Sequence, residues 1–195
     1  MGKVAVFDFD GTLRRGDSFV DFARFVVGTP RFLLAVLRSF PSLAGWKLGL
    51  CSNAVAKQRL FRALYRGMDY GRFKSLGEEF ASEDSRKRMN DATWQAFHSH
   101  VAAGDIVLVA TASVGEWVSP FFAKYGVPVF STEVEVDSEG MLTGRFSTPN
   151  CHGAEKVERL MRAYPRIIDM HVTLYTDSAD DAPLMAIAQK VVMVD

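Results

Sequence analysis

The chain has 195 residues, of which 48% are hydrophobic and 24% charged, with 23 basic and 23 acidic side chains. This length allows a full hydrophobic core and favours one domain, with room for an insertion. A formal net charge of zero gives no support to a nucleic-acid partner, because such proteins usually carry a basic surface. Cys51 and Cys151 lack metal-ligand spacing, so we interpret both as packing residues in a reducing compartment.

Short apolar runs predict the strands of a parallel sheet. The runs cover residues 4–9, 106–110, 127–131, 172–175 and 191–194, and helical patterns at 114–125, 154–164 and 181–189 separate most of them. Continuous apolar strands that alternate with helices predict an α/β fold whose sheet is covered on both faces. Polar and apolar residues alternate on both sides of Ser138-Glu139-Gly140, which predicts an added hairpin. The first strand begins almost at the N-terminus without a signal-peptide pattern, so we expect a cytoplasmic protein.

Residues 14–96 interrupt the alternation of strands and helices. They contain no convincing strand, and helical periods appear at 18–27, 54–65 and 72–80. The simplest interpretation is an all-helical insertion between the first and second strands. We therefore expect a discontinuous core made of residues 1–13 and 97–195, with residues 14–96 as a separate helical domain.

The segment from Arg31 to Leu50 is apolar enough to raise the question of a membrane. Arg38, Pro41 and Lys47 interrupt it, and no window of ~18 uncharged residues remains. We predict a pair of amphipathic helices hinged at Pro41 rather than a spanning helix. A membrane-surface element is the alternative.

Two acids follow the first strand, in the stretch VAVFDFDGTL. Asp8 and Asp10 are two residues apart, so they project to the same side of the chain. In parallel sheets the functional crevice lies beyond the carboxyl ends of the strands. Two anions at such a place repel each other unless a cation or a shared proton offsets them. The pair therefore predicts a functional site.

Other strand ends supply matching polar groups. Asp177 follows the strand at 172–175, and all-oxygen ligands favour a hard cation such as Mg²⁺. Ser178 and Asp181 have the spacing of a capping box at the start of the next helix. Thr111 stands at the tip of the second strand, where a hydroxyl can contact phosphate. Ser113 and Glu116 form a second capping box, so we expect Ser113 to begin a helix.

Lys156 stands in the first turn of the predicted helix at 154–164. A cation there opposes the helix dipole, which is typical either of an exposed lysine or of a functional position. Cys151 and His152 have no further partner for a metal site, and His98 and His100 do not share a helix face.

Taken in order, these residues resemble the four motifs of the haloacid dehalogenase-like superfamily. The motifs are Asp8-Phe9-Asp10-Gly11-Thr12-Leu13, the strand-ending Thr111, Lys156 after Gly153, and Asp177-Ser178-x-x-Asp181. The arrangement is similar to the phosphoserine-phosphatase-type subgroup, which implies a Rossmann-like core with a helical cap inserted after the first motif. Within it, NCHGAEKV and YTDSADD are more similar to poorly characterised relatives and to bacterial phosphatidylglycerophosphate phosphatases.

The resemblance implies a role for each matching residue. Asp8 would attack phosphorus and become an aspartyl phosphate, and Asp10 would serve as general acid and then general base. Asp8, the Asp10 backbone carbonyl and Asp177 would hold Mg²⁺. The phosphate would be bound by Gly11, Thr111 and Lys156. Asp181 would orient Lys156 or a metal-bound water.

The resemblance also implies that the inserted helices select the leaving group. Asp17 has the spacing of an acid that binds a substrate ammonium group, although it could equally cap the helix from Ser18. Arg14 and Arg15 could face phosphate or solvent. Arg59 and Arg62 are candidates for binding a substrate carboxylate only because they lie in the inserted helices.

We expect a Mg²⁺-dependent phosphatase of a small-molecule phosphomonoester. The first alternative is a lipid-phosphate phosphatase at a membrane surface, and the second is a non-catalytic binding module. The sequence does not identify the oligomeric state.

Overall fold

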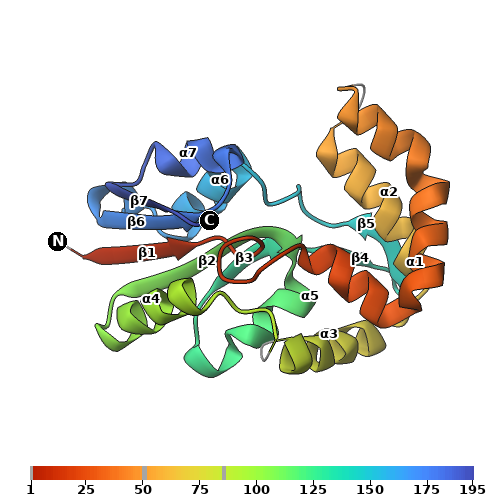
Figure 1. The fold of residues 1–195 in the computed structure, drawn as a ribbon, viewed down its shortest axis with the longest axis horizontal. Coiled ribbons are helices and arrows are strands. Elements are labelled where there is room, and N and C mark those ends of the chain that lie inside the picture. The colour runs from red at the N-terminus through yellow and green to blue at the C-terminus, as the bar shows by residue number, and fades with distance from the viewer. Residues whose placement is uncertain (1, 50–51, 85–86) are drawn as a thin grey trace.

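The computed structural model describes residues 2–49, 52–84 and 87–195 and shows an α/β fold with an inserted set of helices (Figure 1). Cys51 lies outside the described residues. The strands are β1 Lys3–Phe7, β2 Ile106–Val114, β3 Val129–Thr132, β4 Val134–Val136, β5 Leu142–Phe146, β6 His171–Thr176 and β7 Lys190–Met193. The α-helices are α1 Ser18–Lys47, α2 Asn53–Tyr65, α3 Tyr70–Asp84, α4 Asp91–Ala102, α5 Gly115–Val118, α6 Ala154–Ala163 and α7 Ala182–Met185.

Five strands form one parallel sheet in the order β3-β2-β1-β6-β7. β1 is central because it pairs with both β2 and β6. Its residues alternate between two cores: Ala5 and Phe7 face one side, and Val4 and Val6 face the other. In Figure 1, α4 and α5 lie on one side of the sheet and α6 and α7 on the other. The predicted α/β fold class and its parallel sheet are confirmed.

Helix α1 bends at Gly28, not at Pro41 as predicted. Gly28 has φ 76° and ψ 158°, whereas the helix continues through residue 41 to Lys47. Gly readily adopts positive φ, and Pro30 cannot continue a helix without a clash with the preceding turn. The pair Gly28 and Pro30 therefore divides α1 into an inner half, residues 18–27, and an outer half, residues 29–47.

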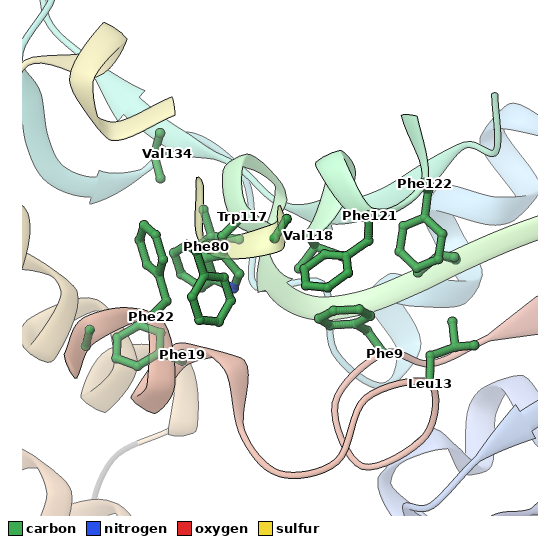
Figure 2. Close-up of a cluster of buried hydrophobic side chains, with 14 of the residues drawn as sticks. Phe9, Leu13, Phe19, Phe22, Phe80, Trp117, Val118, Phe121, Phe122 and Val134 are labelled. Atoms are coloured by element: carbon green, nitrogen blue, oxygen red, sulfur yellow. The ribbon is translucent and has the colours of Figure 1, made fainter. Parts of the chain in front are cut away.

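Aromatic side chains join the inserted helices to the sheet (Figure 2). Phe22 of α1 stacks on Trp117 of α5, with ring centroids 4.6 Å apart. Phe80 of α3 meets Phe22 edge to face at 5.4 Å. Phe9, just after β1, packs against Phe121 at 5.1 Å. These rings form one continuous buried cluster, so the base of the inserted helices shares its core with the sheet.

Helix α4 lies against the sheet, although the expected boundary of the helical domain, residue 96, falls inside it. Phe97 of α4 packs on Phe7 of β1 at 5.7 Å, and His100 bonds through Nε2 to the Tyr175 hydroxyl at 3.0 Å. We propose that the inserted helices end before Asp91, because α4 shares the core of the sheet.

Two segments predicted as long helices are short. The segment 114–125 contains α5 and two 3-10 turns, Ser119–Phe121 and Ala123–Tyr125, and 181–189 contains only α7. Pro120 cannot donate a helical hydrogen bond to the turn before it, which limits α5, whereas Pro183 stands in the first turn of α7, where proline is tolerated. The predicted hairpin is present as β4 and β5, and β5 packs along α2.

Candidate active site

The predicted site residues meet at the carboxyl ends of β1, β2 and β6. Because these neighbouring strands are parallel, their ends lie on the same edge of the sheet. The loop after β1 supplies Asp8, Asp10 and Gly11, the end of β2 supplies Thr111, and the segment after β6 supplies Asp177 and Asp181. Helix α6 adds Lys156 from the sheet face that it covers.

Lys156 is a buried cation at this edge of the sheet, and it contacts two carboxylates. Its Nζ lies 3.0 Å from Asp8 Oδ1 and 2.8 Å from Asp181 Oδ1, and its side chain is 3% exposed. Thr176 donates a hydrogen bond of 2.7 Å to Asp181 Oδ2. Burial alone lowers the pKa of Lys156, but the two carboxylates outweigh it and raise that pKa above its usual value. Lys156 is thus held as a charged group, and the alternative of an exposed lysine is excluded.

Asp8 is a buried carboxylate with few stabilising contacts of its own. Burial raises its pKa, the Lys156 ammonium lowers it, and the charge of Asp181 raises it again. The backbone N–H of Phe9 donates a 2.8 Å hydrogen bond to Asp8 Oδ1. Two carboxylates share one lysine here, so the cluster of Asp8, Lys156 and Asp181 carries a net negative charge in a buried place.

Asp10 turns away from Lys156 and is surrounded by hydroxyl groups. Its carboxylate accepts hydrogen bonds from Ser18 N at 2.7 Å, Ser18 Oγ at 2.9 Å and Ser113 Oγ at 2.5 Å. Burial raises the pKa of Asp10 to about 6, with a further rise from the charge of Asp17. A carboxyl group with a pKa near 6 exchanges a proton readily at neutral pH, as a general acid and base must.

Ser113 does not begin a helix, so that prediction is wrong. It remains in β2, whose end is Val114, and its hydroxyl is used on Asp10. The Ser113 backbone N–H donates instead to Thr111 Oγ1 at 3.0 Å. Thr111, which we expected at the strand tip, lies inside β2, where the pairing with β3 shifts between Ala110 and Val114, and it is 1% exposed.

Gly11 allows Asp177 to approach the loop after β1. Gly11 has φ 76°, and a Cβ there would lie 1.9 Å from Asp177 Oδ2. Thr12 donates a hydrogen bond of 3.1 Å to Asp177 Oδ1. Any other residue at position 11 would push the Asp177 carboxylate away, so this glycine is required by the close approach of two segments.

The donor set around Asp8 fits a hard divalent cation. Asp8 and Asp177 offer carboxylate oxygens, and the loop after β1 offers main-chain carbonyls. All of these are ligands typical of Mg²⁺. In the part of the chain that the structure describes, no three acidic, histidine or cysteine side chains form a metal cluster. The Asp10 carboxylate is committed to Ser18 and Ser113, so only its backbone carbonyl is available to a metal.

Lys57 also belongs to this site, and the sequence analysis missed it. From α2, its Nζ donates hydrogen bonds to the carbonyl of Ala112, between Thr111 and Ser113, and to Asn150 Oδ1 at 3.0 Å. Burial lowers its pKa to about 8, although the charges of Asp10 and Asp17 oppose this change. The available signal was its position: Lys57 precedes Leu60 and Phe61 by three and four residues, so it shares the buried side of α2.

The other charged candidates of the inserted helices have structural contacts. Asp17 caps α1, since its Oδ1 accepts hydrogen bonds from the backbone N–H groups of Phe19 at 2.9 Å and Val20 at 3.3 Å. Arg14 is fully buried and binds Asp84 at 2.6 Å and Asp21 at 2.7 Å, so it faces neither phosphate nor solvent.

Arg59 and Arg62 are exposed on α2 and do not reach the strand ends. Arg59 donates to the Ser42 hydroxyl of α1, and Arg62 lies against Gly144 of the hairpin. Cys151 is buried and unpaired, and burial raises its pKa to about 11, as expected of a packing residue.

The carboxyl edge of the parallel sheet thus brings together a carboxylate paired with a buried lysine and a second carboxyl group of raised pKa. The model of the haloacid dehalogenase-like hydrolase family matches residues 5–186, and the chain belongs to this family.

Known proteins resemble the chain over nearly its whole length. It is 27% identical to Protein CicA of Caulobacter vibrioides, over 96% of this chain and 83% of that protein. It is 25% identical to phosphoserine phosphatase SerB1 of Mycobacterium tuberculosis, over 98% of this chain and 64% of that protein. Both relatives match nearly the whole of this chain, and one of them carries the name phosphoserine phosphatase.

Solved structures share the fold. A protein of unknown function from Bordetella pertussis superposes with a TM-score of 0.80 at 25% identity, over 98% of this chain and 89% of that one. A substrate-bound phosphoserine phosphatase gives a TM-score of 0.64 at 15% identity, over 99% and 86% of the two chains. The second likeness concerns the fold alone.

Proposed function

We propose that this protein is a Mg²⁺-dependent phosphatase that hydrolyses a phosphomonoester through an aspartyl phosphate on Asp8. The observation that carries the proposal is that two neighbouring acids, Asp8 and Asp10, have different surroundings. Asp8 lies 3.0 Å from the Lys156 ammonium, whereas Asp10 lies among hydroxyl groups with a pKa of about 6. One carboxylate is therefore suited to attack and the other to transfer protons.

Asp8, Asp177 and the Asp10 main-chain carbonyl would hold the magnesium ion. The bound cation supplies positive charge that offsets both the carboxylates and the phosphoryl oxygens. The net negative charge of Asp8, Lys156 and Asp181 supports this assignment, because a buried anionic cluster needs a further cation. The close approach of Asp177 to Gly11 brings the second carboxylate to the same loop.

The chemistry takes two steps on the chain's own residues. Asp8 Oδ attacks phosphorus while the bond to the ester oxygen breaks, and Asp10 gives its proton to the leaving alkoxide. A water then attacks the phosphorus of the aspartyl phosphate and gives a proton to the ionised Asp10, while the bond between Asp8 Oδ and phosphorus breaks. Inorganic phosphate leaves, and both Asp8 and Asp10 return to their starting states. Splitting one hydrolysis into two displacements is what a carboxylate nucleophile offers.

Other residues position the phosphoryl group and its anionic transition state. Lys156 and the Thr111 hydroxyl would contact phosphate oxygens, together with the backbone of Gly11. Asp181 holds Lys156 in place at 2.8 Å. Lys57 adds a second cation from the inserted helices and would contact either the phosphate or the leaving group.

A small-molecule phosphomonoester is the first candidate substrate, since a relative carries the name phosphoserine phosphatase. In this assignment Asp17 would have to bind substrate in addition to capping α1. A lipid phosphate at a membrane surface is the second candidate, and it is favoured by the exposed leucines of the outer half of α1.

The substitution Asp8→Asn tests the proposal directly. We expect turnover of p-nitrophenyl phosphate with Mg²⁺ to fall by about a thousandfold or more, because the amide is a poor nucleophile. Asp169→Asn is a matched control, since Asp169 is exposed and distant from the strand ends. Circular dichroism would confirm that both variants fold.

A trapping experiment adds an independent readout. Beryllium fluoride with Mg²⁺ should form a stable mimic of the aspartyl phosphate on the wild type and not on Asp8→Asn. Full activity in Asp8→Asn would contradict the mechanism. Absence of both turnover and trapping in the wild type would instead favour a binding module.

A further inference from the structure

The outer half of α1 exposes four large apolar side chains, although Phe32 is buried, and it also buries small ones. Leu33, Leu34, Leu37 and Phe40 are 56%, 45%, 69% and 60% exposed. On the opposite side Ala35, Ser39 and Ser42 are buried. A helix that only packs on a protein core shows the reverse pattern, with leucines inside and serines outside. The exposed leucines therefore need another explanation.

These exposed residues form one stripe with basic residues beside it. At 100° per residue, Leu33, Leu37 and Phe40 lie on one line along the helix, and Leu34 lies next to them. Arg31 and Arg38 are seven residues apart, so they lie together along the border of the stripe, and both are exposed. We call these six residues the docking face: Arg31, Leu33, Leu34, Leu37, Arg38 and Phe40.

The segment of the chain that carries the docking face is one-sided in charge, although the hairpin that packs on α2 contains acids such as Glu135 and Asp137. Residues 22–68 contain eight basic side chains and no acid: Arg24, Arg31, Arg38, Lys47, Lys57, Arg59, Arg62 and Arg66. Because the whole chain has zero net charge, the remainder carries eight more acids than bases. Electrostatics would thus orient the molecule with the α1–α2 end toward an anionic surface.

The docking face lies at an extremity of the molecule. In Figure 1 the outer half of α1 and its neighbour α2 project beyond the sheet, so a flat surface could approach them. Among the described residues, no helix is long and apolar enough to cross a membrane. A leucine stripe bordered by arginines on a non-spanning helix is typical of an element that lies in the membrane interface.

We propose that the docking face binds the surface of an anionic lipid bilayer, with the leucines and Phe40 inserted among the lipids and the arginines on the headgroups. A second copy of the chain fits less well, because a symmetric dimer through this face would bring Arg31 and Arg38 of the two copies close together. The proposal rests on the surface of α1 and not on the chemistry proposed for Asp8.

Vesicle co-sedimentation tests this docking. We expect the full-length protein to sediment with vesicles that contain phosphatidylglycerol and to remain in the supernatant with phosphatidylcholine alone. The double variant Leu33→Ser/Leu37→Ser should lower partitioning by about tenfold or more. Each of Arg31→Gln and Arg38→Gln should lower partitioning to anionic vesicles by about fivefold.

Two controls keep the result interpretable. Ile168→Ser removes an aliphatic side chain that is 50% exposed on another part of the surface, and it should leave sedimentation unchanged. Turnover of p-nitrophenyl phosphate by Leu33→Ser/Leu37→Ser should equal that of the wild type, which shows that the variant folds. Asp8→Asn should bind vesicles normally, so a failure of the catalytic proposal would be visible separately.

Three results would overturn the docking proposal. The first is a wild-type protein that stays in the supernatant with anionic vesicles. The second is equal binding to neutral and anionic vesicles. The third is a wild-type dimer in size-exclusion chromatography that Leu33→Ser/Leu37→Ser converts to a monomer, because the stripe would then be an interface between copies.

Discussion

Both halves of α1 are rich in apolar residues, but they differ in how many of their large side chains are exposed. In the inner half, Phe19 and Phe22 are 7% and 0% exposed, and Phe22 stacks on Trp117. In the outer half, Leu37 is 69% exposed, while Ser39 is buried. The change occurs across Gly28, where the helix bends. Apolar content alone therefore does not tell which part of a helix joins the core.

The difference between the halves follows from what each is attached to. Ser18, the first residue of the inner half, donates two hydrogen bonds to Asp10, and Trp117 Nε1 donates to the same serine at 3.1 Å. Arg14 fixes the segment before α1 through its buried contacts with Asp21 and Asp84. The inner half is thus part of the site, whereas the outer half packs on α2 and keeps a surface for other use.

Truncation of one large apolar residue in each half should show the contrast most strongly. We expect Phe22→Ala to lower the free energy of unfolding by about 3–5 kcal/mol, because it leaves a cavity between Trp117 and Phe80. Leu37→Ala should change that free energy by less than about 0.5 kcal/mol, because the side chain is exposed. Urea denaturation measures both values. Equal losses in the two variants would mean that the outer half is buried in the protein's working state.

The bend itself gives a smaller and more specific effect. Gly28 has φ 76°, so Gly28→Ala should lower the free energy of unfolding by about 1–3 kcal/mol through backbone strain. Gly2→Ala is the control, because a Cβ there would make an ordinary contact with Met170 at 3.8 Å. Thermal denaturation of the two variants is the measurement. An unchanged melting temperature in Gly28→Ala would show that the bend is not fixed by this residue.

The sheet and the residues at its carboxyl edge could be predicted from the sequence. Buried parallel strands are continuous apolar runs, so residues 4–9 and 172–175 were recognisable without structural information, and Asp8 and Asp177 follow them directly. Their meeting follows from the adjacency of β1 and β6. The start of α6 left Lys156 open between an exposed lysine and a functional position, and the resemblance to the four motifs favoured the second.

The sequence was less informative where two local patterns competed. At Ser113 the capping-box spacing pointed to a helix, but β2 extends to Val114 and the hydroxyl serves Asp10. The segment around Pro41 predicts a hinge there, yet Gly28 and Pro30 break the helix earlier. The spacing of two residues between Thr111 and Ser113 was the signal that both hydroxyls belong to one strand end.

The spacing of Lys57 from Leu60 and Phe61 places it on the apolar side of α2, but the sequence does not show what its ammonium contacts. Eight cations occur between residues 22 and 68, and only tertiary packing decides which of them turns inward. Arg59, two residues further on, is exposed and bonded to Ser42 instead. Substitution of Lys57 and of Arg59 should therefore distinguish a residue of the site from a residue of the surface.

The pH dependence of Lys57→Gln should reveal that role. Burial lowers the pKa of Lys57 to about 8, so its ammonium is present at pH 7 and is lost as the pH rises through that value. We expect Lys57→Gln to lower kcat/KM for p-nitrophenyl phosphate about tenfold at pH 7, as removal of a charged hydrogen bond would. The ratio of wild type to variant should approach one near pH 9. Arg59→Gln should leave the profile unchanged.

Unfolding measurements test the lowered pKa of Lys57 independently of activity. Since the folded pKa lies near 8 and the ordinary value is 10.5, the unfolded chain binds more protons between these pH values. The contribution of Lys57 therefore destabilises the folded state below pH 8 and disappears as the pH rises toward 10.5. Wild type should gain stability over this range relative to Lys57→Gln. If neither the activity ratio nor the stability difference changes with pH, then Lys57 is solvated like Arg59, and the contrast between the two faces of α2 is wrong.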